Sequence, residues 1–79
     1  MPYIREQYKE ILENDTPKNP GELNYKITKT CIEYLHNEGT SYKTINEIIG
    51  VLECAKMEFY RRIAVPYENL KKKENGDVY

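Results

Sequence analysis

The sequence predicts an all-α fold: a three-helix domain with a long third helix, assembled as a homo-oligomer. Three segments carry apolar residues at helical spacing, and proline and glycine residues separate them. No segment alternates apolar and polar residues over the length of a strand. The chain has 79 residues, and a chain of that size buries only about 60% of the surface that its unfolded form exposes. We therefore expect a single helical domain over residues 1–79 that needs a partner to complete its core.

The first helix is predicted over about residues 3–13, where four apolar side chains fall on one face at helical spacing. They are Ile4, Tyr8, Ile11 and Leu12. Two prolines and several turn-forming residues follow in the segment 14–20, which predicts a loop.

The second helix is predicted over about residues 20–37. Asn19 has the side chain of an N-cap, Pro20 occupies the first helical position, and Glu22 completes a variant of the capping box. We expect Gly39 to stop this helix as a left-handed C′ residue.

The third and longest helix is predicted over about residues 41–65, with Ser41 or Thr44 as its N-cap. One arc of this helix is apolar, and we expect it to pack on the first two helices. This arc, called the core stripe below, consists of Ile45, Ile48, Ile49, Leu52, Ala55, Phe59 and Ile63.

We expect the third helix to be interrupted at a proline. Pro66 has no backbone N–H, and its ring clashes with the carbonyl group of Arg62 in an α-helix, so we expect the helix to end or kink there. A short helical turn is predicted over 67–73 and a tail over 74–79. The composition of the tail alone predicts disorder.

The opposite side of the third helix differs from an ordinary solvated face. Gly50 and Cys54 are small and one turn apart, and an internal glycine costs a helix about 1 kcal/mol relative to alanine. Either the glycine is tolerated on a mixed surface, or small residues let a second helix approach across a symmetric dimer axis. We favour the second interpretation. The predicted oligomer interface, called the seam below, consists of Gly50, Val51, Cys54, Met57, Glu58 and Arg61.

Basic and phenolic side chains near the end of the third helix are candidates for ligand binding. Lys56 lies within the apolar arc, so either its stem lies on apolar surface with the ammonium group in water, or a carboxylate or a ligand anion holds it. Tyr60 follows four residues later and is within reach of it. Arg61 and Arg62 form structural ion pairs, or two-fold symmetry brings copies of Arg61 together into an anion site.

Composition argues against several classes of function. With 12 basic and 13 acidic residues the net charge is −1, so no overall field attracts nucleic acid. A single histidine and two widely spaced cysteines form no metal-ligand pattern and no catalytic constellation, and no phosphate-binding glycine loop is present. We expect a non-enzymatic protein without metal or cofactor. No apolar segment is long enough for a signal peptide or a membrane span, which predicts a cytoplasmic protein with reduced thiols.

Five motifs are distinctive from Gly21 onward: GELNY at 21–25, INEIIGVLECAK at 45–56, YRR at 60–62, PYE at 66–68 and ENGDVY at 74–79. In these motifs the sequence resembles a widespread family of short proteins encoded by bacteriophages and prophages. The resemblance implies a soluble protein in the cytoplasm of a host bacterial cell, and it supplies no activity. Because Gly50, Cys54 and Arg61 of the seam and the whole tail lie within these motifs, the resemblance favours a contact role for the seam and a docked tail.

These inferences together predict an accessory protein of a phage or prophage. The leading hypothesis is a non-enzymatic homo-oligomer, with a dimer as the first expectation, that acts by binding a host or phage protein. The alternative is an oligomeric sequestering protein that binds an anionic, nucleotide-like small molecule at a subunit interface. In that case the ligand would contact Lys56, Tyr60, Arg61 and Arg62.

Overall fold

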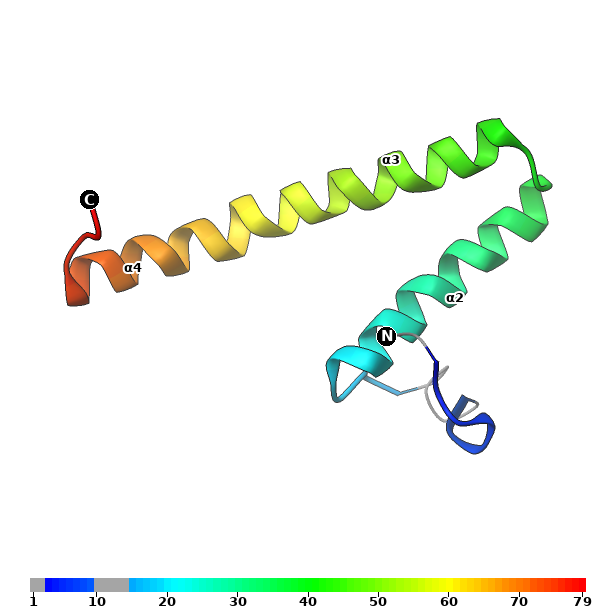
Figure 1. Cartoon of the computed structure of the whole chain (residues 1–79), viewed down its shortest axis with the longest axis horizontal. Helices are drawn as coiled ribbons and strands as arrows, with labels where there is room; N and C mark the ends of the chain where they lie inside the picture. The colour runs from blue at the N-terminus through cyan, green and yellow to red at the C-terminus, as the bar shows by residue number, and fades with distance from the viewer. Residues whose placement is uncertain (1–2, 10–14) are drawn as a thin grey trace. The chain divides into compact units, whose positions relative to one another are not determined.

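The computed structural model describes residues 3–9 and 15–79, which contain helices and no strand (Figure 1). The all-α class and the long last helix are confirmed. Residues 6–9 are helical, and the longer elements are α2 (Pro20–Glu38), α3 (Tyr42–Phe59), the π-helical segment η1 (Tyr60–Ala64) and α4 (Val65–Asn75).

The chain divides into two compact units, Met1–Ile45 and Asn46–Tyr79. The single domain expected over residues 1–79 stays a prediction. In the first unit, the helix expected over 3–13 begins only at Glu6, and Lys9 and Glu6 form an ion pair at 2.9 Å one turn apart. Residues 10–13 of that expected helix lie outside the described residues.

Helix α2 begins and ends at the expected signals. The side-chain oxygen of Asn19 accepts a hydrogen bond from the backbone N–H of Glu22 at 2.9 Å. The Glu22 carboxylate in turn accepts from the backbone N–H of Lys18, also at 2.9 Å, so it reaches one residue further back than in a standard capping box. At the other end Gly39 has φ +93°, a value that side chains disfavour, and its N–H donates to the carbonyl oxygen of Leu35.

Ser41 is the N-cap of α3. The Ser41 hydroxyl oxygen accepts a hydrogen bond from the backbone N–H of Thr44 at 3.1 Å, and the two hydroxyl groups lie 3.0 Å apart. Thr44 is the one buried side chain of the described residues, with an exposed fraction of 6%. Its hydroxyl is satisfied by this contact, so the buried position carries no unpaired polar group.

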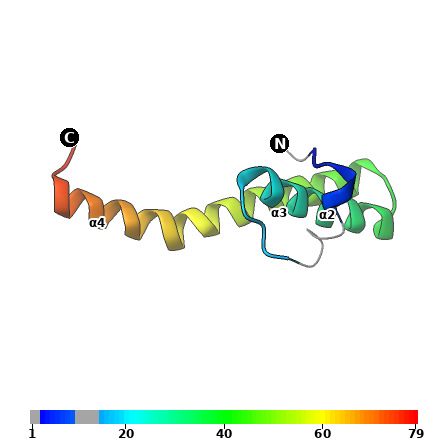
Figure 2. The same ribbon diagram turned by 90° about the horizontal axis from the view of Figure 1, so that it is seen from below.

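The long helix does not end at Pro66. Helix α3, η1 and α4 form one helical run of 34 residues, which is uninterrupted in two perpendicular views (Figure 1 and Figure 2). The backbone N–H of Val65 donates to the carbonyl oxygen of Tyr60, five residues back, which defines the wider π turn. The expectation of a helix end at residue 65 is wrong because the π turn lies directly before the proline, where α geometry would drive its ring into the Arg62 carbonyl. The turn expected over 67–73 belongs to α4.

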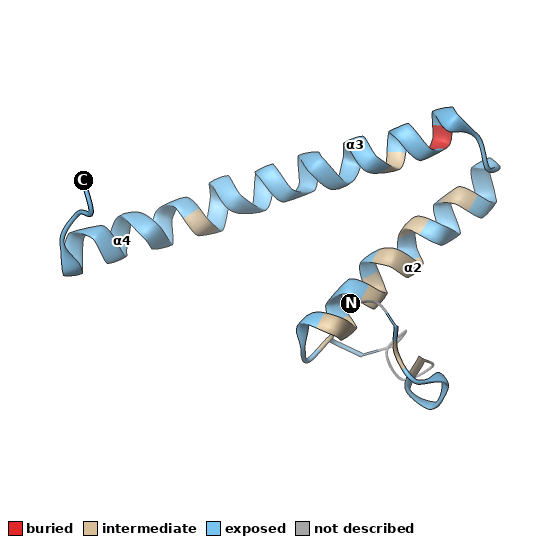
Figure 3. Cartoon of the chain, in the orientation of Figure 1, coloured by how far each residue is buried: buried red, intermediate tan, exposed pale blue. Residues whose placement is uncertain are grey.

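The core stripe is not buried within its own unit. Figure 3 colours most of the long helix as exposed. The exposed fraction is 60% for Ile49, 37% for Leu52 and 67% for Phe59. Within the unit that begins at Asn46, a single helical run has no second helix on which to pack. The expectation that the first two helices cover the stripe stays a prediction, and the unit by itself leaves this apolar face for another surface to cover.

Candidate functional site

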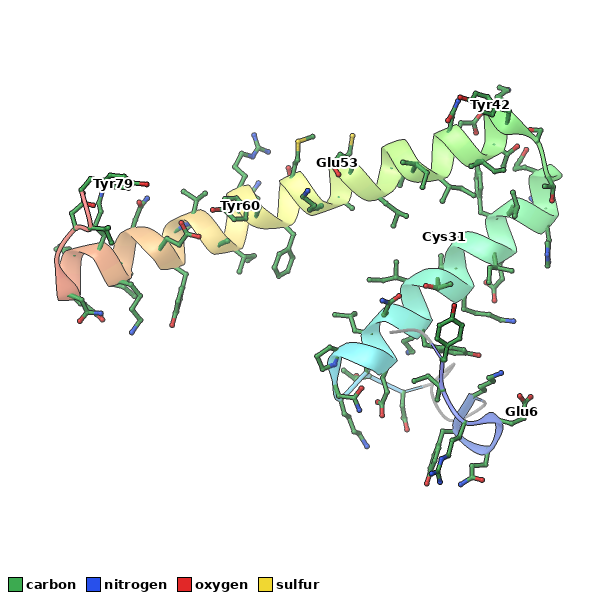
Figure 4. The ribbon with its side chains drawn as sticks, viewed as in Figure 1. Glu6, Cys31, Tyr42, Glu53, Tyr60 and Tyr79 are labelled. Atoms are coloured by element: carbon green, nitrogen blue, oxygen red, sulfur yellow. The ribbon has the colours of Figure 1, made fainter. Side chains whose placement is uncertain are left out.

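Lys56 lies on the exposed surface of α3 and pairs with an acidic residue of its own helix. Its ammonium nitrogen lies 3.3 Å from a carboxylate oxygen of Glu53, one turn earlier. The Lys56 side chain is 72% exposed and that of Glu53 57% exposed, and Figure 4 marks Glu53 near the middle of the helix. A pair this exposed contributes well under about 1 kcal/mol. Lys56 is therefore accessible, and its charge is partly neutralised within the chain.

Arg61 and Arg62 share one carboxylate. A guanidinium nitrogen of Arg61 lies 2.6 Å from one oxygen of Glu58, and one of Arg62 lies 3.8 Å from the other. The contacts span three and four residues, the separations at which helical side chains meet. Although adjacent residues point in different directions, the structure brings both arginines to the same acidic side chain. Neither guanidinium is left as an unpaired cation for a ligand.

Tyr60 contacts Glu68 across the π turn, which sequence reasoning missed. The Tyr60 hydroxyl donates a hydrogen bond to the Glu68 carboxylate at 3.0 Å. Residues eight apart in an α-helix lie about 80° apart around the axis. The π turn takes up roughly one extra residue and so rotates α4 until Glu68 lies beneath Tyr60. The signal in the sequence was Pro66, which lies between the two residues and does not fit an undisturbed α-helix.

This contact sets the acidity of the phenol. The hydrogen bond to Glu68, followed by the negative charge of that carboxylate, raises the pKa of Tyr60 above its usual value near 10. A raised folded-state pKa means that the contact adds stability below pH about 10, and that this stability is lost as the pH rises through the folded-state pKa.

The Glu68→Gln variant tests the contact. We expect the pKa of Tyr60 to fall back toward that of an ordinary tyrosine, because a neutral amide accepts a weaker hydrogen bond from the phenol than the carboxylate does and carries no charge that disfavours the phenolate. The readout is an NMR titration with tyrosine labelled at the ring carbon that bears the hydroxyl, which separates Tyr60 from the other tyrosines. Glu74→Gln is the control, since Glu74 pairs with Lys71 and leaves Tyr60 untouched. An unchanged pKa of Tyr60 in Glu68→Gln would contradict the contact.

The seam is open in this structure. A methyl group added at Gly50 would meet no atom within 4 Å, and Val51 and Met57 are 67% and 54% exposed. Cys54 is an exposed free thiol. No described atom lies close enough to position 50 to require a glycine there.

The described parts of the chain include a hollow in each unit. One of about 250 Å³ is lined by side chains of α2, namely Tyr25, Lys26, Lys29, Thr30 and Glu33. The other, of about 470 Å³, lies where the C-terminal tail turns back beside α4. The expected ligand-binding residues of α3 and η1 line neither of them.

The tail after α4 has its own contacts. The backbone N–H of Gly76, at φ +90°, donates to the carbonyl oxygen of Lys72, and the Lys72 ammonium lies 3.6 Å from the carboxylate of Asp77. Asp77 also accepts a hydrogen bond from the backbone N–H of Tyr79. The tail is thus held near the end of its own helix, whereas composition alone predicts disorder. The side chain of Val78 stays 95% exposed.

Comparison with known proteins places the chain in a family. Among the described residues no group of histidine, cysteine, aspartate and glutamate side chains could hold a metal ion, and no described helix is long and apolar enough to cross a membrane. Neither the curated proteins nor the solved structures contain a match to this chain. A family model described as a domain of unknown function (DUF6899) matches residues 1–78, and the chain therefore belongs to that family.

Proposed function

We propose that this chain is a non-enzymatic accessory protein of a phage or prophage, which acts in the cytoplasm of the host cell by binding other proteins. The observation that carries the proposal is the exposure of large apolar side chains along the helix from Tyr42 to Asn75. Soluble proteins rarely leave a contiguous apolar surface of this kind without a partner. The phage setting rests on the resemblance of the motifs between Gly21 and Tyr79.

The proposal assigns different roles to the two faces of the helix. The core stripe is the more apolar face and suits a second copy of the chain in a homo-oligomer. The seam has small residues and a charged pair, Glu58 with Arg61, at its end. The seam was expected above to be the oligomer interface. We propose instead that it receives a helix of the host or phage partner, because Gly50 allows a backbone to approach closely.

Gly50 separates helix stability from partner binding. Gly50→Ala is expected to stabilise the helix by about 1 kcal/mol, because the new methyl group meets no neighbour and alanine favours helix. Gly50→Leu also favours helix but blocks close approach of a partner backbone. Circular dichroism melts measure the first effect, and photo-crosslinking from position 57 in infected cells measures the second.

We expect Gly50→Ala to keep more of the seam crosslink than Gly50→Leu does. Both variants are expected to have a Tm no lower than that of the natural chain. A photo-crosslinker at Lys73, remote from the seam, is the matched control for nonspecific labelling. If Gly50→Leu leaves the crosslinked product unchanged, the seam is not the contact surface.

The alternative, sequestration of an anionic nucleotide-like molecule, has less support. Lys56 already pairs with Glu53, and both arginines pair with Glu58, on an exposed helix surface. A thermal-shift screen with nucleotides and cyclic nucleotides tests it directly. A ligand at a hundred times its Kd would stabilise the protein by roughly 2.7 kcal/mol, which such a screen detects. We expect no such shift.

A further inference from the structure

A heptad repeat runs through the core stripe. Positions spaced alternately by four and three residues from Ile45, the spacing of helices that pair as a coiled coil, take in five members of the stripe and Lys56. Apart from one lysine, every position is a large apolar residue with an exposed fraction of 37% or more. The series is Ile45, Ile49, Leu52, Lys56, Phe59 and Ile63.

We infer that a second copy of this chain docks on the stripe in antiparallel orientation, with the two-fold axis beside residue 54. In that register residues equally distant from 54 face each other across the interface. Ile49 of one copy packs on Phe59 of the other, and Leu52 packs against the stem of Lys56. A two-fold interface must be self-complementary in this way, and the pattern of the stripe satisfies the requirement. This inference deepens the proposed function, since it rests on the helix faces being binding surfaces.

The charge of Lys56 selects the orientation. In a parallel pair the two Lys56 side chains would face each other within the apolar contact, and like charges taken out of water are costly. In the antiparallel pair the axis lies between Glu53 and Lys56, so two ammonium groups and two carboxylates gather around it. The pair seen within one helix, 3.3 Å apart, is then free to extend across the axis. The group of four carries no net charge.

The same charge selects the register. Sliding the partner by one heptad in either direction sets Lys56 opposite Ile45 or Phe59. The residue that then takes the place of Glu53 is Asn46 or Tyr60, neither of which carries a negative charge. Only the axis beside residue 54 brings a carboxylate to Lys56. A single charged residue within a heptad core fixes register and partner number in this manner at some cost in stability.

The length of the contact is sufficient for pairing. With the axis beside residue 54, the overlapping segment runs from Tyr42 to Pro66, all of it within the continuous helix. This overlap is about three and a half heptads long, and the heptad series from Ile45 to Ile63 occupies just under three of them. Ile63 lies within the π turn one helical turn after Phe59, so the widened turn keeps it on the stripe. Most of α4 extends beyond the pair.

Charge reversal on the full chain tests the inference. Glu53→Lys gives a chain with two basic groups at the axis, and Lys56→Glu gives one with two acidic groups. Each variant alone is expected to lose self-association, with the dimer Kd raised at least about tenfold. An equimolar mixture of the two is expected to recover the dimer as a heterodimer. Analytical ultracentrifugation at micromolar concentration is the measurement, with helix content followed by circular dichroism. Lys72→Glu, outside the overlap, is the control for net charge.

Crosslinking fixes the orientation. In a Cys31→Ser, Cys54→Ser background, a chain with Ile49→Cys mixed with a chain with Phe59→Cys is expected to give a covalent dimer with a short bismaleimide. Either chain alone is expected to give much less. A parallel pair reverses this result, because like positions then face each other, and that outcome overturns the antiparallel assignment.

Three further outcomes decide the rest. If the natural chain sediments as a monomer at a concentration of about tens of micromolar, the inference is overturned, because the stripe is then not covered by a second copy. If the mixture of Glu53→Lys and Lys56→Glu chains does not recover the dimer, the role assigned to Glu53 and Lys56 is overturned. If seam crosslinks persist in a monomeric protein, the proposed function stands and this inference is overturned. If the protein is a dimer but gives no seam crosslinks, this inference stands and the proposed function is overturned.

Discussion

Replacing Leu52 with aspartate is expected to dissociate the protein and to remove most of its cooperative thermal unfolding. Leu52 is 37% exposed, less than Ile49 or Phe59 on the same stripe, and it lies next to the proposed axis. Burial of a leucine side chain contributes about 1.5–3 kcal/mol. A two-fold dimer buries the side chain once in each copy, so the dimer Kd should rise about a hundredfold or more.

The thermal effect follows from how little each unit buries by itself. The unit Asn46–Tyr79 is a single helical run, and none of its side chains is buried. A run that buries so little alone cannot offset the entropy of ordering its backbone. Folding must then draw on the burial that assembly supplies, which makes the Tm rise with protein concentration.

Val51→Asp is the matched control for this prediction. Val51 is the neighbouring residue, is 67% exposed and belongs to the seam on another side of the helix. Both variants add the same charge to the same turn, so they share any effect on the helix itself. We expect Val51→Asp to keep the dimer and its Tm while weakening the seam crosslink. Equal losses of Tm in the two variants, measured by differential scanning calorimetry at several concentrations, would count against the stripe as the assembly face.

Local signals in the sequence were sufficient where a single side chain satisfies a backbone group. Asn19 and Glu22 cap α2, and Gly39 ends it with a positive φ, because these effects are decided within a few residues. The choice between Ser41 and Thr44 needed the structure, since both hydroxyl groups occur at acceptable positions.

What covers the stripe could not be predicted from its pattern. The spacing of Ile49, Leu52 and Phe59 identifies a face to be buried, but it does not say whether the cover comes from the same chain or from another. We expected two helices of the same chain, and the unit Asn46–Tyr79 by itself leaves the face exposed. The ion pairs of the candidate ligand residues could not be predicted for a related reason. A list of basic residues omits the acidic neighbours Glu53 and Glu58 that pair with them one turn away.

Pro66→Ala is expected to convert the π turn into regular α-helix. Alanine restores a backbone N–H at residue 66, which can donate to the carbonyl oxygen of Arg62, and it removes the ring that α geometry cannot accommodate there. A proline inside a helix costs up to about 3 kcal/mol relative to alanine, so the variant should be more stable by an amount up to that value. The gain is measured by chemical denaturation of the natural and variant chains at matched concentration.

The structural consequence is a rotation of α4 that Tyr60 reports. Loss of the extra residue in η1 turns everything after it by about 100° relative to α3, so Glu68 moves away from the Tyr60 hydroxyl. The pKa of Tyr60 should then fall as it does in Glu68→Gln, although the Glu68 charge is still present in the chain. If the Pro66→Ala variant instead keeps the pKa of Tyr60 raised, the π turn is specified by residues 60–64 themselves, and the proline only occupies a turn that would form without it.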